Sequence, residues 1–291
     1  MTGPAVIRTK AALREELAAA RRQGRTIGLV PTMGSLHEGH LSLIRAAAAR
    51  CDIVVMSLFV NPAQFGAGED FQEYPRDEQR DVRVAGEAGA DLVYAPERAH
   101  VYPEGFATFV EVGGLTDVLC GHPSSRGREH FRGVTTVVAK LLNSVAPDVA
   151  FFGQKDAQQA IVIRRMARDL DLPVEIAVEP TVREPDGLAL SSRNAYLTAK
   201  ERERATALHR ALNAAAGTAG DGMATADALG AARAVLNQAG IEPEYLEARS
   251  ALDLEPVESF NGRPVLLAVA ARVGRARLID NVVVGAEAPA E

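Results

Sequence analysis

Short apolar runs alternate with helix-like patterns between residues 1 and 181 of this 291-residue chain, and the alternation limits the possible folds more than any other feature. The apolar runs are typical of strands buried on both faces, and they lie at residues 27–30, 52–60, 91–94, 149–152 and 174–178. Between the strands, apolar residues recur at helical spacing at residues 10–23, 41–48, 76–88, 133–145 and 158–170. Residues 107–112 are one more candidate strand. This order predicts an α/β fold, a doubly wound parallel sheet that binds its ligand at the carboxyl ends of the strands.

The pattern changes near residue 181. Alanine-rich helical patterns follow at 199–217 and 224–239, and alternating strand patterns follow at 244–249, 265–273 and 277–284. We therefore predict two domains: a Rossmann-like nucleotide-binding domain at 1–181 and a smaller α+β domain at 182–291.

Composition excludes several classes of function. The net charge of −6 provides no basic field of the kind that non-specific nucleic-acid binding needs, so we expect no nucleic-acid partner. No apolar run approaches the length of a membrane span. Cys51 and Cys120 lie far apart without metal-ligand spacing, which predicts reduced thiols and a cytoplasmic protein. Lysine occurs only at positions 10, 140, 155 and 200, a weak indication that Lys155 is more than surface charge.

The stretch from Pro31 to His40 follows the first buried strand and opens a helix. A helix N-terminus presents unpaired backbone N–H groups and the positive end of the helix dipole, so this turn is a natural phosphate site. His37 and His40 are three residues apart at this point. From the residues alone they could be solvated or capping histidines, phosphate ligands or a metal pair, although no third metal ligand lies nearby in the sequence.

Six ordered blocks resemble the pantothenate synthetase family. They lie at residues 31–40 (PTMGSLHEGH), 59–65 (FVNPAQF), 74–76 (YPR), 130–134 (HFRGV), 152–159 (FGQKDAQQ) and 191–194 (SSRN). The first block alone is shared with other nucleotidylyl transferases and with class I aminoacyl-tRNA synthetases. The ordered set is far more specific, and it spans about residues 26–285.

The resemblance implies an ATP-dependent ligase. In that family the pantoate carboxylate attacks the α-phosphorus of ATP to give pantoyl adenylate and pyrophosphate, and β-alanine then displaces AMP to give pantothenate. It further implies Mg²⁺, a homodimer, and a large domain that binds pantoate as well as the nucleotide. No enzyme nucleophile is needed, in agreement with the lack of a recognisable activated serine or cysteine in the sequence.

The resemblance also assigns roles to individual residues. The catalytic set on ATP is His37, His40, Lys155 and Arg193; the nucleotide contacts are Pro31, Met33, Gly153, Asp156, Ser191 and Ser192. The resemblance assigns pantoate binding to Asn61, Gln64 and Gln159, and magnesium binding to Asp81. Without the family, the amides read as turn residues, Lys155 and Asp81 as solvated charges, and the serines as a helix cap.

Two departures from the family pattern leave questions open. Residues 127–130 read Gly-Arg-Glu-His and lack a common Arg-Pro pair, so either Arg126 or Arg128 could face the site. Leu190 replaces a frequent methionine at nearly equal volume. We expect loops 66–74 and 190–194 to exclude water from the adenylate. The rival interpretations are a nucleotidylyl transferase with another product and a nucleotide-binding regulatory protein without turnover.

Overall fold

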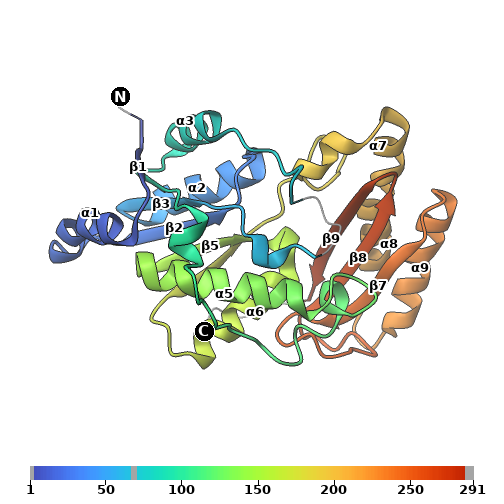
Figure 1. The fold of residues 1–291 in the computed structure, drawn as a ribbon. Helices are drawn as coiled ribbons and strands as arrows, with labels where there is room; N and C mark the ends of the chain where they lie inside the picture. The colour runs from blue at the N-terminus through green and yellow to red at the C-terminus, as the bar shows by residue number, and fades with distance from the viewer. Residues whose placement is uncertain (1–2, 67–70, 286–291) are drawn as a thin grey trace.

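A six-stranded parallel sheet forms the larger part of the computed structural model, which describes residues 3–66 and 71–285 (Figure 1). Its strand order is β1-β4-β3-β2-β5-β6. The strands are β1 (Ala5–Ile7), β2 (Ile27–Thr32), β3 (Ile53–Leu58), β4 (Leu92–Tyr94), β5 (Val149–Gly153) and β6 (Glu175–Glu179). The chain order turns back between β2 and β5, and the carboxyl ends of these two central strands carry most of the predicted site residues. This is the doubly wound Rossmann-like fold that the sequence predicts.

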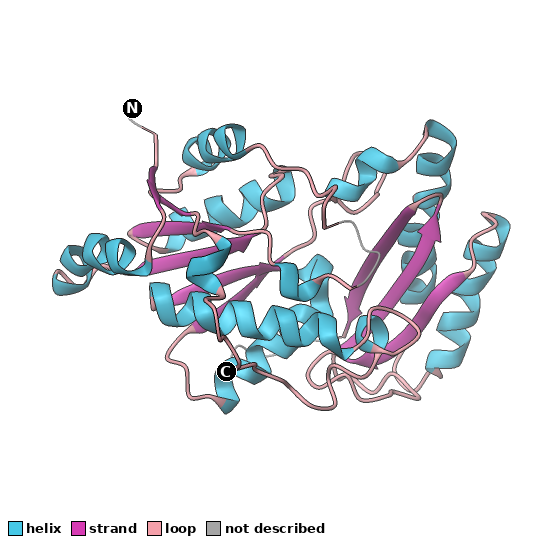
Figure 2. Cartoon of the chain, viewed as in Figure 1, coloured by secondary structure: helices cyan, strands magenta, loops and turns pink. Residues whose placement is uncertain are grey.

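Helices cover both faces of this sheet, as the alternating layers in Figure 2 show. The helices of this domain are α1 (Lys10–Arg22), α2 (Glu38–Arg50), α3 (Glu78–Ala88), α4 (Arg98–Val101), α5 (Arg128–Val145) and α6 (Ala157–Asp169). Leu29 and Phe152 point into the core beneath α1, α5 and α6, whereas their chain neighbours Val30 and Phe151 point into the core beneath α2 and α3. Successive strand residues therefore serve opposite cores, which is why each strand reads as a continuous apolar run.

The smaller domain begins after β6 and packs an antiparallel sheet, in the order β7-β8-β9, against helices. Its strands are β7 (Pro243–Ser250), β8 (Val265–Val273) and β9 (Ala276–Val284), and its helices are α7 (Ala199–Ala205), α8 (Ala207–Thr218) and α9 (Thr225–Gln238). Fully buried alanines on α8 and α9, such as Ala211 and Ala232, let these helices approach each other closely. Figure 1 places this domain beside the carboxyl ends of the parallel strands.

In the part of the chain that the structure describes, four short 3₁₀ turns lie where the two domains meet or where strands end: η1 (Pro62–Gln64), η2 (Leu119–Gly121), η3 (Gln154–Asp156) and η4 (Ser192–Tyr196). Three of them hold predicted site residues. None of the helices in the described ranges is both long and apolar enough to cross a membrane.

The candidate strand at 107–112 is wrong. This described segment joins neither sheet. The backbone groups of Val110 bind side chains of helix α5 instead: the Val110 N–H donates to Thr136 Oγ1 at 3.0 Å, and Thr135 Oγ1 donates to the Val110 carbonyl at 2.6 Å. Helix α5 also starts at Arg128 rather than at residue 133, directly after Gly127 with its φ of 77°. The predicted helix at 199–217 is interrupted at Thr206, and strand β1 escaped prediction because it has only three residues.

Candidate active site

A cavity of about 250 Å³ lies between the two domains, at the carboxyl ends of β2 and β5. Every predicted site residue except Asp81 lines it: Pro31, Met33, His37, His40, Asn61, Gln64, Gly153, Lys155, Asp156, Gln159, Ser191, Ser192 and Arg193. Residues separated by more than 150 positions in the chain thus meet in one place. A smaller cavity of about 90 Å³ adjoins it and shares Lys155, Gln159 and Arg193.

The two histidines form an unusual helix start at α2. His37 is the N-cap residue, and its Nδ1 accepts the Gly39 N–H at 3.2 Å, while the His37 N–H donates to His40 Nδ1 at 3.3 Å. The ring centroids are 4.1 Å apart. Because each Nδ1 accepts a backbone proton, each neutral ring carries its own proton on Nε2. The pair therefore presents two N–H donors to the cavity.

Both histidines stay neutral at physiological pH. Burial, followed by the charge of Lys155, lowers the pKa of His37 to about 4. Burial, the neighbouring His37 and Lys155 lower the pKa of His40 to about 3. A neutral imidazole with its proton on Nε2 can donate to a phosphate oxygen without first gaining a second proton, and it leaves the positive charge of the site to lysine and arginine.

Asp81 lies beneath the turn that leads to these histidines. Its carboxylate is 1% exposed and accepts the N–H groups of Ser35 at 2.7 Å and Leu36 at 2.9 Å. Gly34 occupies the turn with a φ of 88°, and a Cβ there would lie 3.0 Å from Asp81 Oδ2. Asp81 and Gly34 therefore fix the path of the backbone from β2 into α2.

Asp81 does not fit a direct magnesium ligand, because both of its oxygens already bind backbone amides. Within residues 3–66 and 71–285, no group of three or more His, Cys, Asp or Glu side chains is arranged to hold a metal ion.

The predicted pantoate residues follow β3. Asn61 is 1% exposed and uses its whole amide: Nδ2 donates to Gln64 Oε1 at 3.1 Å and to the Gly133 carbonyl at 3.0 Å, and Oδ1 accepts from Tyr102 and from a turn N–H. Gln64 Nε2 contacts Met33 Sδ at 3.0 Å. Asn61 thus holds Gln64 at the cavity wall. Gly133 is required here, because a Cβ would lie 2.1 Å from the Ala63 carbonyl oxygen.

Lys155 and Asp156 sit in η3, between β5 and α6. The ammonium of Lys155 lies 3.1 and 3.2 Å from the two carboxylate oxygens of Asp156. Burial opposes ionisation of Asp156, but Lys155, Arg193 and His40 together lower the pKa of its carboxyl below the usual value. Asp156 is therefore ionised, and it holds Lys155 in the cavity beside the histidines.

The segment that carries Ser191, Ser192 and Arg193 closes the cavity from the side of the small domain. Ser191 caps η4 by accepting the Arg193 N–H on its Oγ at 3.2 Å. Asn194 Nδ2 donates to Glu184 Oε1 at 2.8 Å, and Arg202 pairs with the same carboxylate at 2.6 Å. These contacts tie the segment to helix α7.

Sequence reasoning left one choice open and missed several cavity residues. Arg126 lines the cavity, with NH1 3.2 Å from His130 Nε2 and NH2 3.3 Å from the Gln64 carbonyl. Arg128 instead pairs with Asp117 at the surface, so Arg126 is the arginine that faces the site. The histidine of the 130–134 block signalled His130, whose Nδ1 lies 2.8 Å from the same carbonyl.

Thr181 was not signalled by any motif. It follows the end of β6 and lines the cavity, and its buried Oγ1 has no hydrogen-bond partner among the described residues. Of the loop predicted at 66–74, residues 67–70 lie outside the described residues, but Tyr74 lines the cavity and its hydroxyl contacts the Gly34 carbonyl at 3.5 Å.

Comparison with known proteins identifies the family of this chain. Residues 5–283 match the model of the family described as pantoate-beta-alanine ligase. The pantothenate synthetase of Moorella thermoacetica is 55% identical over 282 residues, which cover 96% of this chain and 98% of that protein.

Solved structures agree with these matches. The crystal structure of pantothenate synthetase from Thermus thermophilus has a TM-score of 0.87 at 47% identity and covers 96% of this chain and 98% of its own. The Francisella tularensis pantoate-beta-alanine ligase, complexed with beta-gamma ATP and beta-alanine, has a TM-score of 0.78 at 30% identity, over 96% and 97% of the two chains.

Proposed function

Because the chain belongs to the pantoate-beta-alanine ligase family, we propose that this enzyme joins pantoate to β-alanine in two ATP-dependent steps. Pantoate carboxylate attacks the α-phosphorus of ATP, so that pyrophosphate leaves and pantoyl adenylate forms. The amine of β-alanine then attacks the acyl carbon of the adenylate, and AMP leaves as pantothenate forms. Beta-gamma ATP and beta-alanine are the molecules in the Francisella tularensis complex. The residue roles proposed here are those that the resemblance implies, and the lining of the cavity supports them.

Charge stabilisation drives the first step in this proposal. Negative charge builds up on the α-phosphoryl oxygens and on the leaving pyrophosphate as the bond to pantoate forms. The Nε2–H groups of His37 and His40 lie on one wall of the cavity, and the cations of Lys155 and Arg193 line the same space. Donors already in place need no rearrangement as charge develops, which is the basis of electrostatic catalysis. Ser191 and Ser192 add hydroxyl donors for the triphosphate, and Pro31, Met33, Gly153 and Asp156 form the remaining nucleotide contacts.

Gln64 and Gln159 suit the pantoate subsite. Both line the cavity, and an amide can donate to a carboxylate while accepting from a hydroxyl. Asn61 supports this subsite through its hydrogen bond to Gln64, so we assign it to substrate binding by way of that residue. Because the substrate carboxylate is held in line with the α-phosphorus, it can attack directly, and the enzyme needs no nucleophile of its own.

The proposal also includes magnesium, a homodimer and a cytoplasmic location, none of which takes part in the steps described above. Magnesium is the ion that accompanies the phosphates of ATP, and no step above runs through it. The homodimer is what the family resemblance implies, and sedimentation at micromolar concentration tests it. The unpaired cysteines Cys51 and Cys120 support a reducing compartment.

One observation carries the proposal: the histidine donors, the Lys155 and Arg193 cations and the two glutamine amides line a single cavity. Exchange of labelled pyrophosphate into ATP tests it. We expect exchange that depends on pantoate and needs no β-alanine. Equal exchange with other hydroxy acids would indicate a nucleotidylyl transferase with a different product, and ATP binding without exchange would indicate a protein that does not form the adenylate.

A further inference from the structure

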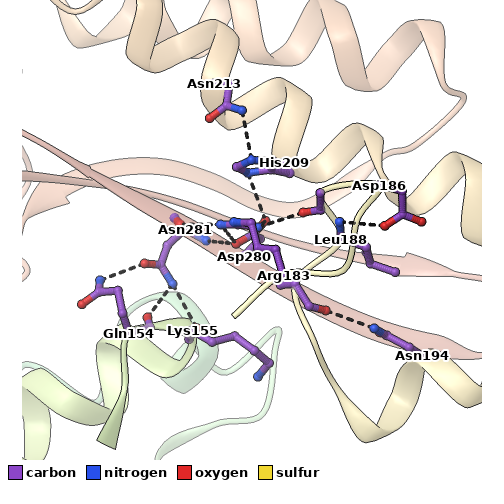
Figure 3. Close-up of polar contacts among 12 residues, drawn as sticks. Gln154, Lys155, Arg183, Asp186, Leu188, Asn194, His209, Asn213, Asp280 and Asn281 are labelled. Atoms are coloured by element: carbon purple, nitrogen blue, oxygen red, sulfur yellow. Dashed lines mark hydrogen bonds and ion pairs between the residues drawn. The ribbon is translucent and has the colours of Figure 1, made fainter. Parts of the chain in front are cut away.

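Two neighbouring residues of the small domain, Asp280 and Asn281 in β9, hold two different parts of the cavity wall (Figure 3). Their side chains are 3% and 5% exposed, although both are strongly polar. Buried polar side chains persist when their hydrogen bonds are satisfied. Most contacts of this pair lead toward residues of the proposed site, and Asp280 Oδ2 also lies 3.8 Å from His209 Nδ1 of α8.

Asn281 binds the turn that carries Lys155. Its Nδ2 donates to the backbone carbonyls of Gln154 at 3.0 Å and Lys155 at 2.9 Å, and its Oδ1 accepts from Gln154 Nε2 at 2.9 Å. An amide is the side chain that can donate twice and accept once at this position. Asn281 therefore fixes the backbone on which the Lys155 side chain is mounted, without touching its ammonium group.

Asp280 binds the start of the segment that ends in Arg193. Arg183 donates to its two oxygens at 2.7 and 2.9 Å, and Arg183 also donates to the Gly187 carbonyl at 3.1 Å. Arg183 pairs with Ala189 through a β-bridge, and the Leu190 N–H donates to the Val182 carbonyl at 3.0 Å. Holding Arg183 consequently holds the chain immediately before Ser191.

The two anchors are coupled to each other. Asp280 Oδ1 accepts the Asn281 N–H at 2.8 Å, and both residues lie on a nine-residue strand in the middle of its pairing with β8. The Lys155 turn and the Arg183 segment thus cannot shift independently without breaking bonds to one dipeptide.

We propose that Asp280 and Asn281 are positioning residues, which set Lys155 and the segment at residues 191–193 at a fixed spacing across the nucleotide. This inference rests on the proposed function, since the spacing matters for catalysis only if both groups act on ATP. A displacement of about 1 Å at a reacting centre can cost about 100-fold in rate, so backbone anchors of this kind have measurable kinetic weight. The competing interpretation is that the pair merely joins the domains.

The test uses Asn281→Ala with Asn143→Ala as its matched control. Asn143 is an exposed asparagine of α5 whose amide contacts only the Ala139 carbonyl among the contacts described, at 2.8 Å. We expect Asn281→Ala to lower the maximal rate of pantoate-dependent pyrophosphate exchange about 10-fold while KM for pantoate changes less than about twofold, as expected for loss of an interaction that matters in the transition state. The control variant keeps the full rate.

A double-mutant cycle separates positioning from general damage. If Asn281 acts through Lys155, Asn281→Ala costs little more once Lys155→Ala has been introduced, because the group being positioned is absent. Rate losses that multiply across the two substitutions would overturn the proposal. Should Asn281→Ala fail to fold, Gln154→Ala takes its place in the test, because it removes only one of the three bonds. We then expect the maximal exchange rate to fall about threefold.

Hydrogen exchange of the protein without substrates gives a readout that does not depend on the reaction. We expect backbone amides in residues 152–159 to exchange at least about fivefold faster in Asn281→Ala than in the wild type or Asn143→Ala. Unchanged exchange there would overturn the anchor. If the wild type instead shows no pantoate-dependent exchange of pyrophosphate, the proposed function fails while this measurement still decides the anchoring of the Lys155 turn.

Arg183→Lys tests the contact between Asp280 and the segment that leads to Ser191. Lysine keeps the charge opposite Asp280 but loses the two-pronged contact and the bond to Gly187. We expect KM for ATP to rise about fivefold with KM for pantoate unchanged. Arg204→Lys is the control, because Arg204 contacts only the Ala239 and Gly240 carbonyls among the contacts described, within the small domain. Equal effects of the two variants would contradict the role of Asp280.

Discussion

The cavity wall from the large domain and the wall from the small domain are fixed by different kinds of contact. The large-domain wall, residues 31–40, 61–64 and 153–159, is held by buried side chains that bind backbone groups: Asp81 beneath the turn, Asn61 beneath Gln64, and Nδ1 of each histidine. The small-domain wall, residues 181–194, is held at its base by the buried pair of Arg183 with Asp280, and its outer part is attached mainly through partly exposed ion pairs. Arg202 bridges Glu184 and Asp186 at 2.6 and 2.8 Å, with all three side chains about one-quarter to one-third exposed.

This difference indicates a division of labour. Buried hydrogen bonds to backbone give a donor array that is complete before ligand arrives, which suits the charge stabilisation proposed for adenylate formation. Partly exposed ion pairs contribute little net stability and are weakened by salt. The outer part of the small-domain wall, around Glu184 and Asn194, can therefore adjust as nucleotide binds, while the Asp280 anchor holds its base. Substitutions in each wall test this difference.

The largest effect is expected from deleting a donor of the large-domain wall. Lys155→Ala or His40→Ala should lower the single-turnover rate of pantoyl adenylate formation by about 100-fold or more, the usual cost of losing one preorganised donor. Lys200→Ala, which removes an exposed lysine near the start of α7, is the control and should leave the rate unchanged. An unchanged rate in either site variant would contradict its assigned role.

The support beneath that wall comes next. Asp81→Asn removes a charge that accepts two backbone N–H groups, and it places an amide donor against one of them, so we expect the free energy of unfolding to fall by about 2–3 kcal/mol. Asp77→Asn, a conservative change at the exposed N-cap of α3, should cost less than about 0.5 kcal/mol. Urea titration measures both.

Asp81→Asn also distinguishes the support from a metal ligand. If Asp81 only shapes the turn, the magnesium concentration that gives half-maximal activity stays the same while the maximal rate falls. A large increase in that concentration would restore the metal assignment.

The same difference between local and long-range contacts explains which features could be predicted from the sequence. Parallel strands with continuous apolar runs and the block order predicted the fold, and strand ends predicted which residues would meet, because those follow from local pattern. The role of Asp81 escaped prediction, since its partners Ser35 and Leu36 are more than 40 positions away, and nothing in the sequence marks a carboxylate that binds backbone. The strand error at 107–112 has the same origin, because Thr135 and Thr136 are supplied by a distant helix.

A third experiment uses pH to probe the large-domain wall. The pKa values of about 4 for His37 and about 3 for His40 lie below the ordinary histidine value of 6.5. As pH falls below about 6.5 the unfolded chain binds protons that the folded protein does not, so stability decreases with falling pH and stops decreasing near pH 3. We expect a loss of about 2–3 kcal/mol between pH 7 and pH 5.5 for the two groups together.

Urea unfolding at several pH values measures this loss, with a His37→Gln/His40→Gln double variant as the comparison. Removing the two titrating groups should flatten the dependence over that interval. An equal slope in both proteins would mean that other groups account for the acid sensitivity.

The smallest effect is expected in the small-domain wall. Arg202→Gln breaks the pairs with Glu184 and Asp186 but leaves the Asn194 bond to Glu184 in place, so the free energy of unfolding should fall by less than about 1 kcal/mol. The freed segment should nevertheless be cut faster by trypsin at Arg193 in the unliganded protein, and ATP with pantoate should restore protection by closing the wall over the nucleotide. Arg168→Gln, which removes an exposed pair with Asp169, controls for loss of surface charge. Because a stability loss this small opens the whole fold very little, faster cutting confined to residues 184–194 would mean local opening of the wall. Equally slow cutting in all three proteins would show that the small-domain wall is as firmly fixed as the large-domain wall, and the contrast between them would not stand.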